Sequence, residues 1–442
     1  MSFLNNFLQN KLVKNSFILI SGNILAGFLG YLFHLLISRK LSIQDYGEVQ
    51  ALTSLLNILA VPTGALYFFI IKYASDFFAK DDAMANYKFY KWLNTNIILL
   101  ILGLTTIFVI TSPLIKSYLH LQNYSNLFII WLVVILGLLV VIQRGILTGW
   151  QDFKNLNRNN IFSAIIKLII GVSLVFIFTS DTSALLGFGA GALFSYFFLK
   201  IVVNKINQNI KKQLTAAKND NHFFDKQKVI NEVKKYILPI LLFSFLITML
   251  NSFDMLMVKN IADENLAGIY GAFNILSKII FWASSSVVMV ILPMACAENS
   301  KQKTLNNKII FYANGLIFMI CLSGLLIYLL LPQLVINLLF GSRYLPMANM
   351  LWAFALMALA LSLLTLEANL AYARYDFKIS YILLATLILE IISVYFFSQS
   401  LLSIALSITI VQFTGYVLSL LYNLKSIKRL QIIQNKELAL FN

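Results

Sequence analysis

The sequence has little charge for its length. Only 12% of its 442 residues are charged, whereas 60% are hydrophobic and the mean hydropathy is +0.81. A chain of this composition cannot keep most of its side chains in water, which excludes an ordinary soluble domain. We therefore interpret it as an integral membrane protein.

Cysteine and histidine are also scarce. The two cysteines, Cys296 and Cys321, lie in or at the end of apolar runs, and His34, His120 and His222 lie on separate segments without metal-ligand spacing. This pattern predicts neither a structural disulfide nor a metal site. No phosphate-binding glycine loop or nucleotide motif is present, and the predicted outer loops are short. We expect a protein that is not an enzyme and that needs no cofactor.

What the sequence has in abundance is long apolar runs. About 20 helical residues cross the roughly 30 Å of hydrocarbon in a bilayer. Twelve runs meet this length, at residues 15–38, 48–71, 91–112, 126–149, 159–180, 183–204, 236–258, 265–295, 307–331, 346–373, 378–398 and 401–424. Each is predicted to be a helix, because lipid cannot satisfy free backbone groups and the alternating segments of a β-barrel are absent.

The chain also contains a repeat. Residues 146–154 read ILTGWQDFK and residues 370–378 read LAYARYDFK, and a fainter match relates Gly47, Ala51 and Leu55 to Gly268, Ala272 and Leu276. Both matches are separated by about half the chain, and both fall at corresponding places in the hydrophobic pattern. The sequence thus predicts two related halves of six helices each.

The charges indicate the orientation in the membrane. Lys and Arg outnumber Asp and Glu by 34 to 18. With the amino terminus in the cytoplasm, most of the basic residues fall on the cytoplasmic side. The outer loops then contain only a few of them, Arg39, Lys40, Lys116, Lys259 and Arg343. This is the positive-inside pattern, and it predicts that both termini are cytoplasmic. The basic excess therefore indicates topology and attraction to anionic membrane lipids rather than binding to nucleic acid.

These patterns define five expected regions. They are an interfacial amino-terminal segment (1–14), an N-lobe (15–204), a basic cytoplasmic linker (205–235), a C-lobe (236–424) and a cytoplasmic tail (425–442). Because each lobe has an even number of helices, both have the same orientation, and their pseudo-twofold axis is expected along the membrane normal. The expected fold is an all-α polytopic membrane protein whose lobes surround a central cavity.

Polar residues inside the apolar runs point to that cavity. An unpaired charge in the middle of a bilayer costs about 2.5 to 3.5 kcal/mol on insertion scales, so such a residue normally faces a bundle interior or water. At helical spacing, polar side chains form stripes on five helices. Their members include Asn23 and Tyr31, Asn160 and Lys167, Asn251 and Asp254, Asn274 and Lys278, and Glu390.

Each charged member also has a purely structural interpretation. Lys167 lies close enough to its helix end to extend toward the interface, and Asp254 lies near the outer end of its helix, where water could solvate it. Glu390 could pair with a lysine. For Lys278, which lies deeper, exposure to the cavity is the favoured interpretation. Arg144 and Glu367 are interpreted as boundary residues.

Several short segments resemble one family. They are Ser21–Asn23, Leu32–Arg39, Asp45–Gly47, Val61–Pro62, Lys72–Tyr73, Leu147–Gly149 with Phe153, Asn251 with Asp254 and Val258–Lys259, Ala267–Tyr270, Leu292–Pro293, and Leu339–Gly341 with Tyr344. Their order and spacing resemble the oligosaccharide flippase, or polysaccharide transport, family. That family belongs to the multidrug, oligosaccharidyl-lipid and polysaccharide exporter superfamily.

The resemblance implies a twelve-helix, two-lobe transporter of the bacterial inner membrane. It would move an oligosaccharide linked to a polyprenyl pyrophosphate from the inner to the outer leaflet, for cell-surface polysaccharide synthesis. Lys167 and Lys278 would bind the pyrophosphate, and Asn274, Asn251, Tyr31 and Trp282 would contact sugars. Asp254 or Glu390 would bind a coupling proton or sodium ion, although nothing in the sequence shows coupling.

Two other functions stay open. A drug exporter of the same superfamily would use acidic residues in the first lobe, and helices 1 to 6 have no carboxylate in mid-membrane. A non-transporting scaffold would dock polysaccharide polymerases or glycosyltransferases through the basic linker and tail. In a scaffold the polar stripes would be packing contacts that water does not reach.

Overall fold

The structure, a computed structural model, consists of helices. It describes the chain except residues 1–10, 81, 217–237, 301–306, 375 and 442. In this described part, twelve helical segments are long and apolar enough to cross a membrane, as the sequence predicts, and no strand occurs. The chain divides into two compact units, unit 1 (Met1–Ser244) and unit 2 (Phe245–Asn442).

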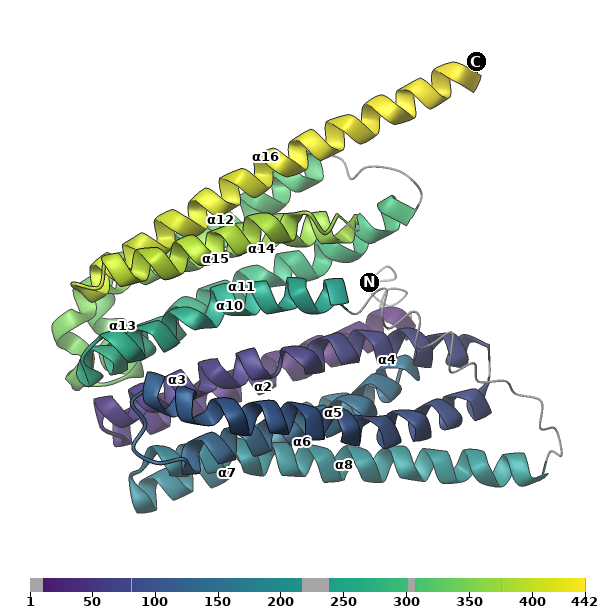
Figure 1. The fold of residues 1–442 in the computed structure, drawn as a ribbon, viewed down its shortest axis with the longest axis horizontal. Helices are drawn as coiled ribbons and strands as arrows, with labels where there is room; N and C mark the ends of the chain where they lie inside the picture. The colour runs from purple at the N-terminus through teal and green to yellow at the C-terminus, as the bar shows by residue number, and fades with distance from the viewer. Residues whose placement is uncertain (1–10, 81, 217–237, 301–306, 375, 442) are drawn as a thin grey trace, which may run out of the picture. The chain divides into compact units, whose positions relative to one another are not determined.

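Unit 1 contains the first six spans (Figure 1). Its helices are α2 (Lys11–Lys40), α3 (Ile43–Leu59), α4 (Val61–Ala79), α5 (Ala83–Tyr118), α6 (Ser125–Gly149), α7 (Phe153–Phe178) and α8 (Asp181–Ala216). The second predicted span is divided into α3 and α4, because Pro62 stands in the first turn of α4, where its missing N–H does no harm.

Unit 2 contains the other six spans. Its elements are α10 (Leu238–Ile261), which begins just before the unit boundary, α11 (Glu264–Ser300), α12 (Asn307–Leu330), α13 (Pro332–Leu339), the 3₁₀ helix η2 (Ser342–Met350), α14 (Leu351–Ala373), α15 (Ile379–Phe396) and α16 (Leu401–Phe441). α14 is the most enclosed helix of this unit, and α11, α12 and α16 all pack against it.

Several helices are longer than the apolar runs predict. Residues 11–14, expected in an interfacial segment, belong to α2, and residues 205–216 of the expected linker belong to α8. The expected tail continues α16, whose 41 residues rise about 60 Å at 1.5 Å per residue. Hydropathy marks only the part of a helix that lies in lipid, so it underestimates helices that continue into water. Residues 1–10 and 217–235 of the expected segments lie outside the described residues.

The repeated motif forms the same turn in both units. The backbone N–H of Asp152 donates to the carbonyl of Leu147 at 2.9 Å, and the N–H of Asp376 donates to the carbonyl of Ala371 at 3.1 Å. These residues match one another in the two copies of the motif. The turns join α6 to α7 and α14 to α15, and Asp152 also caps α7 through the N–H of Asn155 at 3.2 Å.

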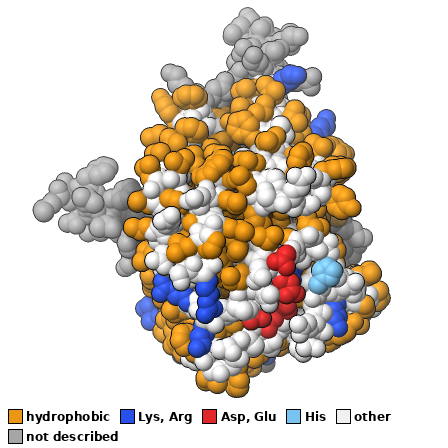
Figure 2. Space-filling view, turned by 90° about the vertical axis from the view of Figure 1, so that its left-hand side faces the viewer, with side chains coloured by type: hydrophobic (Ala, Val, Ile, Leu, Met, Phe, Trp, Pro, Cys, Tyr) orange, Lys and Arg blue, Asp and Glu red, His pale blue; other side chains and the backbone are white. Residues whose placement is uncertain are grey.

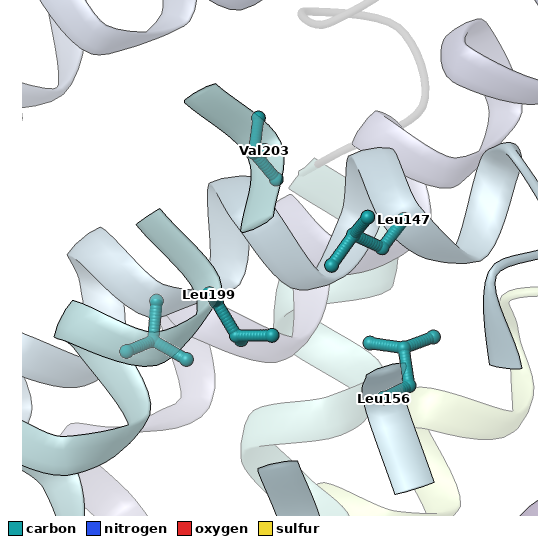
Figure 3. Close-up of a cluster of buried hydrophobic side chains, with 5 residues drawn as sticks. Leu147, Leu156, Leu199 and Val203 are labelled. Atoms are coloured by element: carbon teal, nitrogen blue, oxygen red, sulfur yellow. The ribbon is translucent and has the colours of Figure 1, made fainter. Parts of the chain in front are cut away.

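A small apolar core lies beside this turn in unit 1. Figure 3 shows Leu147 from α6, Leu156 from α7, and Leu199 and Val203 from α8 in one buried cluster. Trp150, the residue after α6, packs against it. Three helices are therefore joined here by apolar contacts, whereas other large apolar side chains of the spans, such as Ile98, Leu99 and Ile110, are exposed, as a membrane-embedded bundle requires.

The opposite end of unit 1 gathers acidic side chains. Asn126 of α6 donates hydrogen bonds to Glu48 of α3 at 2.8 Å and to Asp181 of α8 at 2.6 Å. Figure 2, which looks onto the ends of the helices at the left of Figure 1, shows acidic side chains gathered in one patch. Asp181 is the first residue of α8 and Glu48 lies in the second turn of α3, so these two carboxylates of unit 1 lie near helix ends rather than in mid-span.

Candidate functional site

Unit 1 contains a chain of polar side chains that crosses three helices. Arg144 of α6 donates from Nη2 to Oδ1 of Asn160 on α7 at 3.1 Å, and Asn160 donates from Nδ2 to Oδ1 of Asn23 on α2 at 2.9 Å. On the other side of Arg144, the hydroxyls of Tyr67 and Thr148 are 3.0 Å apart. Every neighbour named here is uncharged.

Lys167 lies two helical turns beyond Asn160 on α7. Its ammonium nitrogen is 3.8 Å from the ring centre of Phe188 on α8 and 4.6 Å from that of Phe33 on α2. These are cation–π contacts, which partly replace the water that an ammonium loses in the bundle. The close approach of α7 and α8 makes them possible, because a Cβ on Gly191 would come within 2.9 Å of the carbonyl oxygen of Ser163.

No carboxylate among the described residues lies in ion-pair range of Arg144 or Lys167. Asn160, to which Arg144 bonds, and Lys167 are seven residues apart on α7, or about 10 Å along the helix. Tyr31 of α2 is half-buried, and its hydroxyl is enclosed without a partner among the residues that the structure describes. Unit 1 therefore offers two cations, amides and a hydroxyl, which is a set of groups suited to an anion.

Unit 2 places carboxylates in the membrane instead. Asp254 of α10 is buried, and its Oδ2 accepts hydrogen bonds from the hydroxyl of Tyr270 and from Nδ2 of Asn274 on α11, both at 2.7 Å. Lys278, one turn further along α11, is half-buried and attracts the Asp254 carboxylate without forming a direct ion pair. The expectation that water at the helix end could solvate Asp254 is therefore wrong.

Glu390 of α15 belongs to the same region. It is buried, its Oε2 accepts a hydrogen bond from Nε2 of Gln412 at 3.0 Å, and its charge repels that of Asp254. Nε2 of Gln412 also donates to the carbonyl of Leu250 at 3.1 Å, which ties α16 to α10. Two nearby carboxylates with amide and hydroxyl neighbours are a suitable environment for a small cation.

The other predicted site residues lie outside this cluster. Asn251 is half-buried on α10, and Trp282 on α11 is exposed, with 56% of its surface accessible. Lys167 belongs to unit 1 and Lys278 to unit 2, where it faces Asp254. The two lysines predicted to act together therefore have different surroundings, since Lys167 has aromatic neighbours and Lys278 has an acidic one.

A second polar network stands at the end of unit 2 that carries the repeated motif. Glu367 of α14 is fully buried and accepts hydrogen bonds from Nδ2 of Asn314 at 3.0 Å and from Nδ2 of Asn423 at 2.6 Å. Arg374 donates to Oδ1 of Asn423. Burial lowers the pKa of the Arg374 guanidinium, and the carboxylates of Asp376 and Glu367 act in the opposite direction. Glu367 is thus the centre of a structural network rather than a boundary residue.

Arg144 is the residue that the sequence analysis misses. It lies five residues before the end of α6 and was interpreted as a boundary residue, yet its guanidinium bonds to α7 inside unit 1. Two signals in the sequence point to it. No acidic residue lies in mid-span in the first half, and Thr148 follows Arg144 by four residues, on the same helix face.

Comparison with known proteins gives the family. The model of the family described as polysaccharide biosynthesis protein matches residues 12–297, which is more than half of the chain. The chain belongs to this family. Its resemblance to the exporter superfamily, noted from the sequence, is confirmed. An uncharacterized membrane protein of Methanocaldococcus jannaschii, MJ1375, is 26% identical over 293 residues, which cover 64% of this chain and 67% of that protein.

Solved structures show that this chain has a known fold. An inward-facing multidrug resistance MATE family transporter of the MOP superfamily aligns over 92% of this chain and 95% of its own, with a TM-score of 0.69 and 12% identity. The lipid II flippase MurJ, in an inward closed conformation, aligns over 92% and 87%, with a TM-score of 0.67 and 15% identity. The fold is therefore that of the transporters of this superfamily, and the chain is a multi-pass membrane protein.

Proposed function

We propose that this chain is a flippase that moves a lipid-linked oligosaccharide, carried on a polyprenyl pyrophosphate, across the cytoplasmic membrane by alternating access. Membership of the polysaccharide biosynthesis family and the fold shared with a lipid II flippase and a multidrug transporter support a transport function of this kind. An anionic substrate is supported by Arg144 and Lys167 in unit 1, because neither cation has a carboxylate in ion-pair range among the described residues.

Arg144 and Lys167 would bind the pyrophosphate. A charge in a low-dielectric bundle is costly unless a partner compensates it, and a diphosphate with several negative charges is such a partner. The planar guanidinium has five N–H donors, of which one bonds to Asn160, so donors are left for phosphate oxygens. Lys278 would contribute less than the sequence suggests, because Asp254 already attracts it.

The sugars would contact amide, hydroxyl and aromatic groups. Tyr31 in unit 1 and Asn251 and Trp282 in unit 2 remain our candidates, since each has surface or a hydrogen-bonding group that the fold leaves unused. Asn274 is a weaker candidate, because its amide nitrogen is bonded to Asp254. The prenyl tail would stay in lipid throughout the cycle.

The carboxylates of unit 2 would bind the coupling ion. Asp254 and Glu390 repel each other, and a proton or a sodium ion between or on them would relieve that repulsion. Occupation of this region would then bias unit 2 toward one conformation, which is how an ion gradient can drive a transporter. We place the chain in the bacterial inner membrane with both termini in the cytoplasm, where polymerases or glycosyltransferases could meet it.

A deletion strain tests this function. The leaflet location of the lipid-linked oligosaccharide and the amount of surface polysaccharide are measured in the deletion strain, with the native chain and with an Arg144→Gln, Lys167→Gln double variant. We expect intermediates to accumulate on the cytoplasmic side in the deletion strain and in the variant, and the native chain to restore export. Unchanged export in a strain without a second homologue would contradict the proposal.

A cation-coupled drug exporter is the second candidate, and the buried pair Asp254 and Glu390 favours it. Membership of the superfamily is compatible with both functions. Uptake of a cationic dye into everted vesicles separates them. Exporter activity that depends on these two carboxylates, with normal surface polysaccharide in the deletion strain, would favour the exporter.

A further inference from the structure

A groove runs along the outside of unit 2 between α12 and α16. It has a volume of about 570 Å³ and is lined by Ile310, Phe311, Asn314, Gly315, Phe318, Leu363, Tyr416, Leu420 and Leu424. Both α12 and α16 pack against α14, and Leu363 of α14 forms the floor between them. We propose that this groove binds one acyl chain of an anionic membrane phospholipid, with the phosphate of the lipid at Lys425.

The groove exists because one wall lacks a side chain. A Cβ atom built on Gly315 would meet no other atom within 4 Å, so the space over this glycine is open. Phe311 and Phe318, one turn to either side of Gly315 on α12, are exposed and stand at the rim. An open strip over a glycine between two exposed aromatic side chains offers an apolar surface on which an unbranched chain can lie.

The walls present hydrocarbon to the groove. Its polar lining residues are Asn314 and Tyr416, and they are bonded to each other, since the tyrosine hydroxyl donates to Oδ1 of Asn314 at 3.1 Å. The amide nitrogen of Asn314 in turn donates to Glu367. Because these polar groups already have partners within the protein, an apolar chain can lie over them without leaving them unsatisfied. The volume is in the usual range for a ligand pocket, about 300 to 1,000 Å³.

Length and charge identify the occupant. The lining positions from Ile310 to Phe318 and from Tyr416 to Leu424 each span nine residues, or about 12 Å of helix from the first to the last. Half of the roughly 30 Å hydrocarbon layer is about 15 Å, so the groove covers most of one leaflet. α12 and α16 run antiparallel, and the end formed by Ile310 and Leu424 is followed on α16 by the exposed Lys425. A lysine at this position attracts a phosphate at the leaflet surface.

A photoreactive lipid tests the proposal. The full chain is placed in phosphatidylcholine nanodiscs that contain phosphatidylglycerol with a diazirine on its acyl chain, and labelled peptides are mapped after illumination. We expect labels on the groove faces of α12 and α16. Gly315→Phe should remove them by filling the groove, whereas Gly103→Phe on α5 is the matched control, because its Cβ also meets nothing within 4 Å. Equal labelling of Gly315→Phe and the native chain would overturn the site.

The headgroup has its own test. Lys425→Gln changes an exposed side chain on which folding does not depend, and it should lower the preference for phosphatidylglycerol over phosphatidylcholine about fivefold. An unchanged preference would overturn the assignment of the phosphate. Unlabelled phosphatidylglycerol should compete for the groove. Competition by a polyprenyl phosphate alone would instead assign the groove to a prenyl tail and overturn the phospholipid. None of these measurements depends on the proposed flippase activity.

Discussion

The two units differ in the charges inside their membrane-spanning helices. Unit 1 has Arg144 and Lys167 with amide and aromatic neighbours and no carboxylate in ion-pair range among the described residues, whereas unit 2 buries Asp254, Glu367 and Glu390. A duplicated bundle would be expected to have the same charges in both copies. This contrast accords with the proposed function, in which unit 1 would bind an anion and unit 2 a cation.

The same contrast appears at the repeated motif. In unit 1, Trp150 packs against a leucine-rich core, and in unit 2 the matching residue is Arg374, which bonds to Asn423. Both turns have the backbone hydrogen bond of the aspartate N–H, although the N–H of Trp150 bonds to Ile146 and that of Arg374 to Ala371. The repeat therefore shares one backbone bond at this turn, while the side chains beside it are apolar in one unit and ionic in the other.

The largest effect is expected for the cations of unit 1. Arg144→Gln together with Lys167→Gln should reduce translocation about 100-fold or more, because removal of one partner of a desolvated charge pair costs about 2 to 5 kcal/mol. Lys278→Gln should have a smaller effect, since Asp254 already offsets that charge. Translocation of lipid-linked oligosaccharide in proteoliposomes measures both. A loss with Lys278→Gln that equals the loss with the double variant would remove the distinction between the units.

The buried glutamate of unit 2 should dominate stability. Glu367→Ala leaves Asn314 and Asn423 without their common acceptor and should destabilise the protein by about 3 kcal/mol. Gln143→Ala, at the matching position of unit 1, should cost less, because no ionic network depends on that residue. Thermal unfolding in detergent compares the two variants, and Glu367→Gln serves as a control that keeps the shape of the side chain. A larger loss with Gln143→Ala would refute this contrast.

Two buried asparagines, one in each unit, should respond in opposite directions. Asn423 of α16 bonds to Glu367 and Arg374, whereas the amide of Asn207 on α8 is buried without a partner among the described residues. Asn423→Leu should destabilise by about 2 kcal/mol, and Asn207→Leu should be neutral or stabilise by about 1 kcal/mol. The same unfolding assay applies. If Asn207→Leu destabilises the protein as much as Asn423→Leu, a ligand or water must form hydrogen bonds with the side-chain amide of Asn207.

The smallest effect concerns Lys278 and Asp254. Their attraction without a direct ion pair should give a coupling energy of about 1 kcal/mol in a double-mutant cycle of Lys278→Gln and Asp254→Asn. Thermal unfolding of the four proteins measures it, with Lys200→Gln as a control because this lysine is exposed and bonds to Tyr196. A coupling energy of zero would mean that Lys278 faces something other than Asp254.

The sequence predicts the twelve helices because length and hydropathy alone decide what spans a bilayer. The resemblance to the exporter superfamily can also be recognised in the sequence, because short motifs along the chain occur in the same order as in that family. Helix ends are predicted less well, because α8 and α16 continue into water, where hydropathy gives no signal. The division of the second span into α3 and α4 depends on Pro62, which a sliding window over apolar residues does not register.

The candidate site could be predicted in part. Helical spacing places Asp254 and Asn274 on inward faces, but it does not reveal which residues on other helices they meet. The bond between Asn274 and Asp254, and the tie from Gln412 to Glu390, are contacts between helices. Arg144 is misjudged for the same reason. Its distance from the helix end suggests a boundary residue, and its neighbour Asn160 is on another helix.

Because α16 is long, its carboxyl end should move measurably when unit 2 tilts. About 30 Å of hydrocarbon covers only half of the roughly 60 Å that this helix spans, so its last part would extend beyond the bilayer as a helical arm. If unit 2 tilts by about 10° during transport, the tip of an arm of about 30 Å moves sideways by about 5 Å. A spectroscopic label near the carboxyl end would then follow each cycle from outside the membrane.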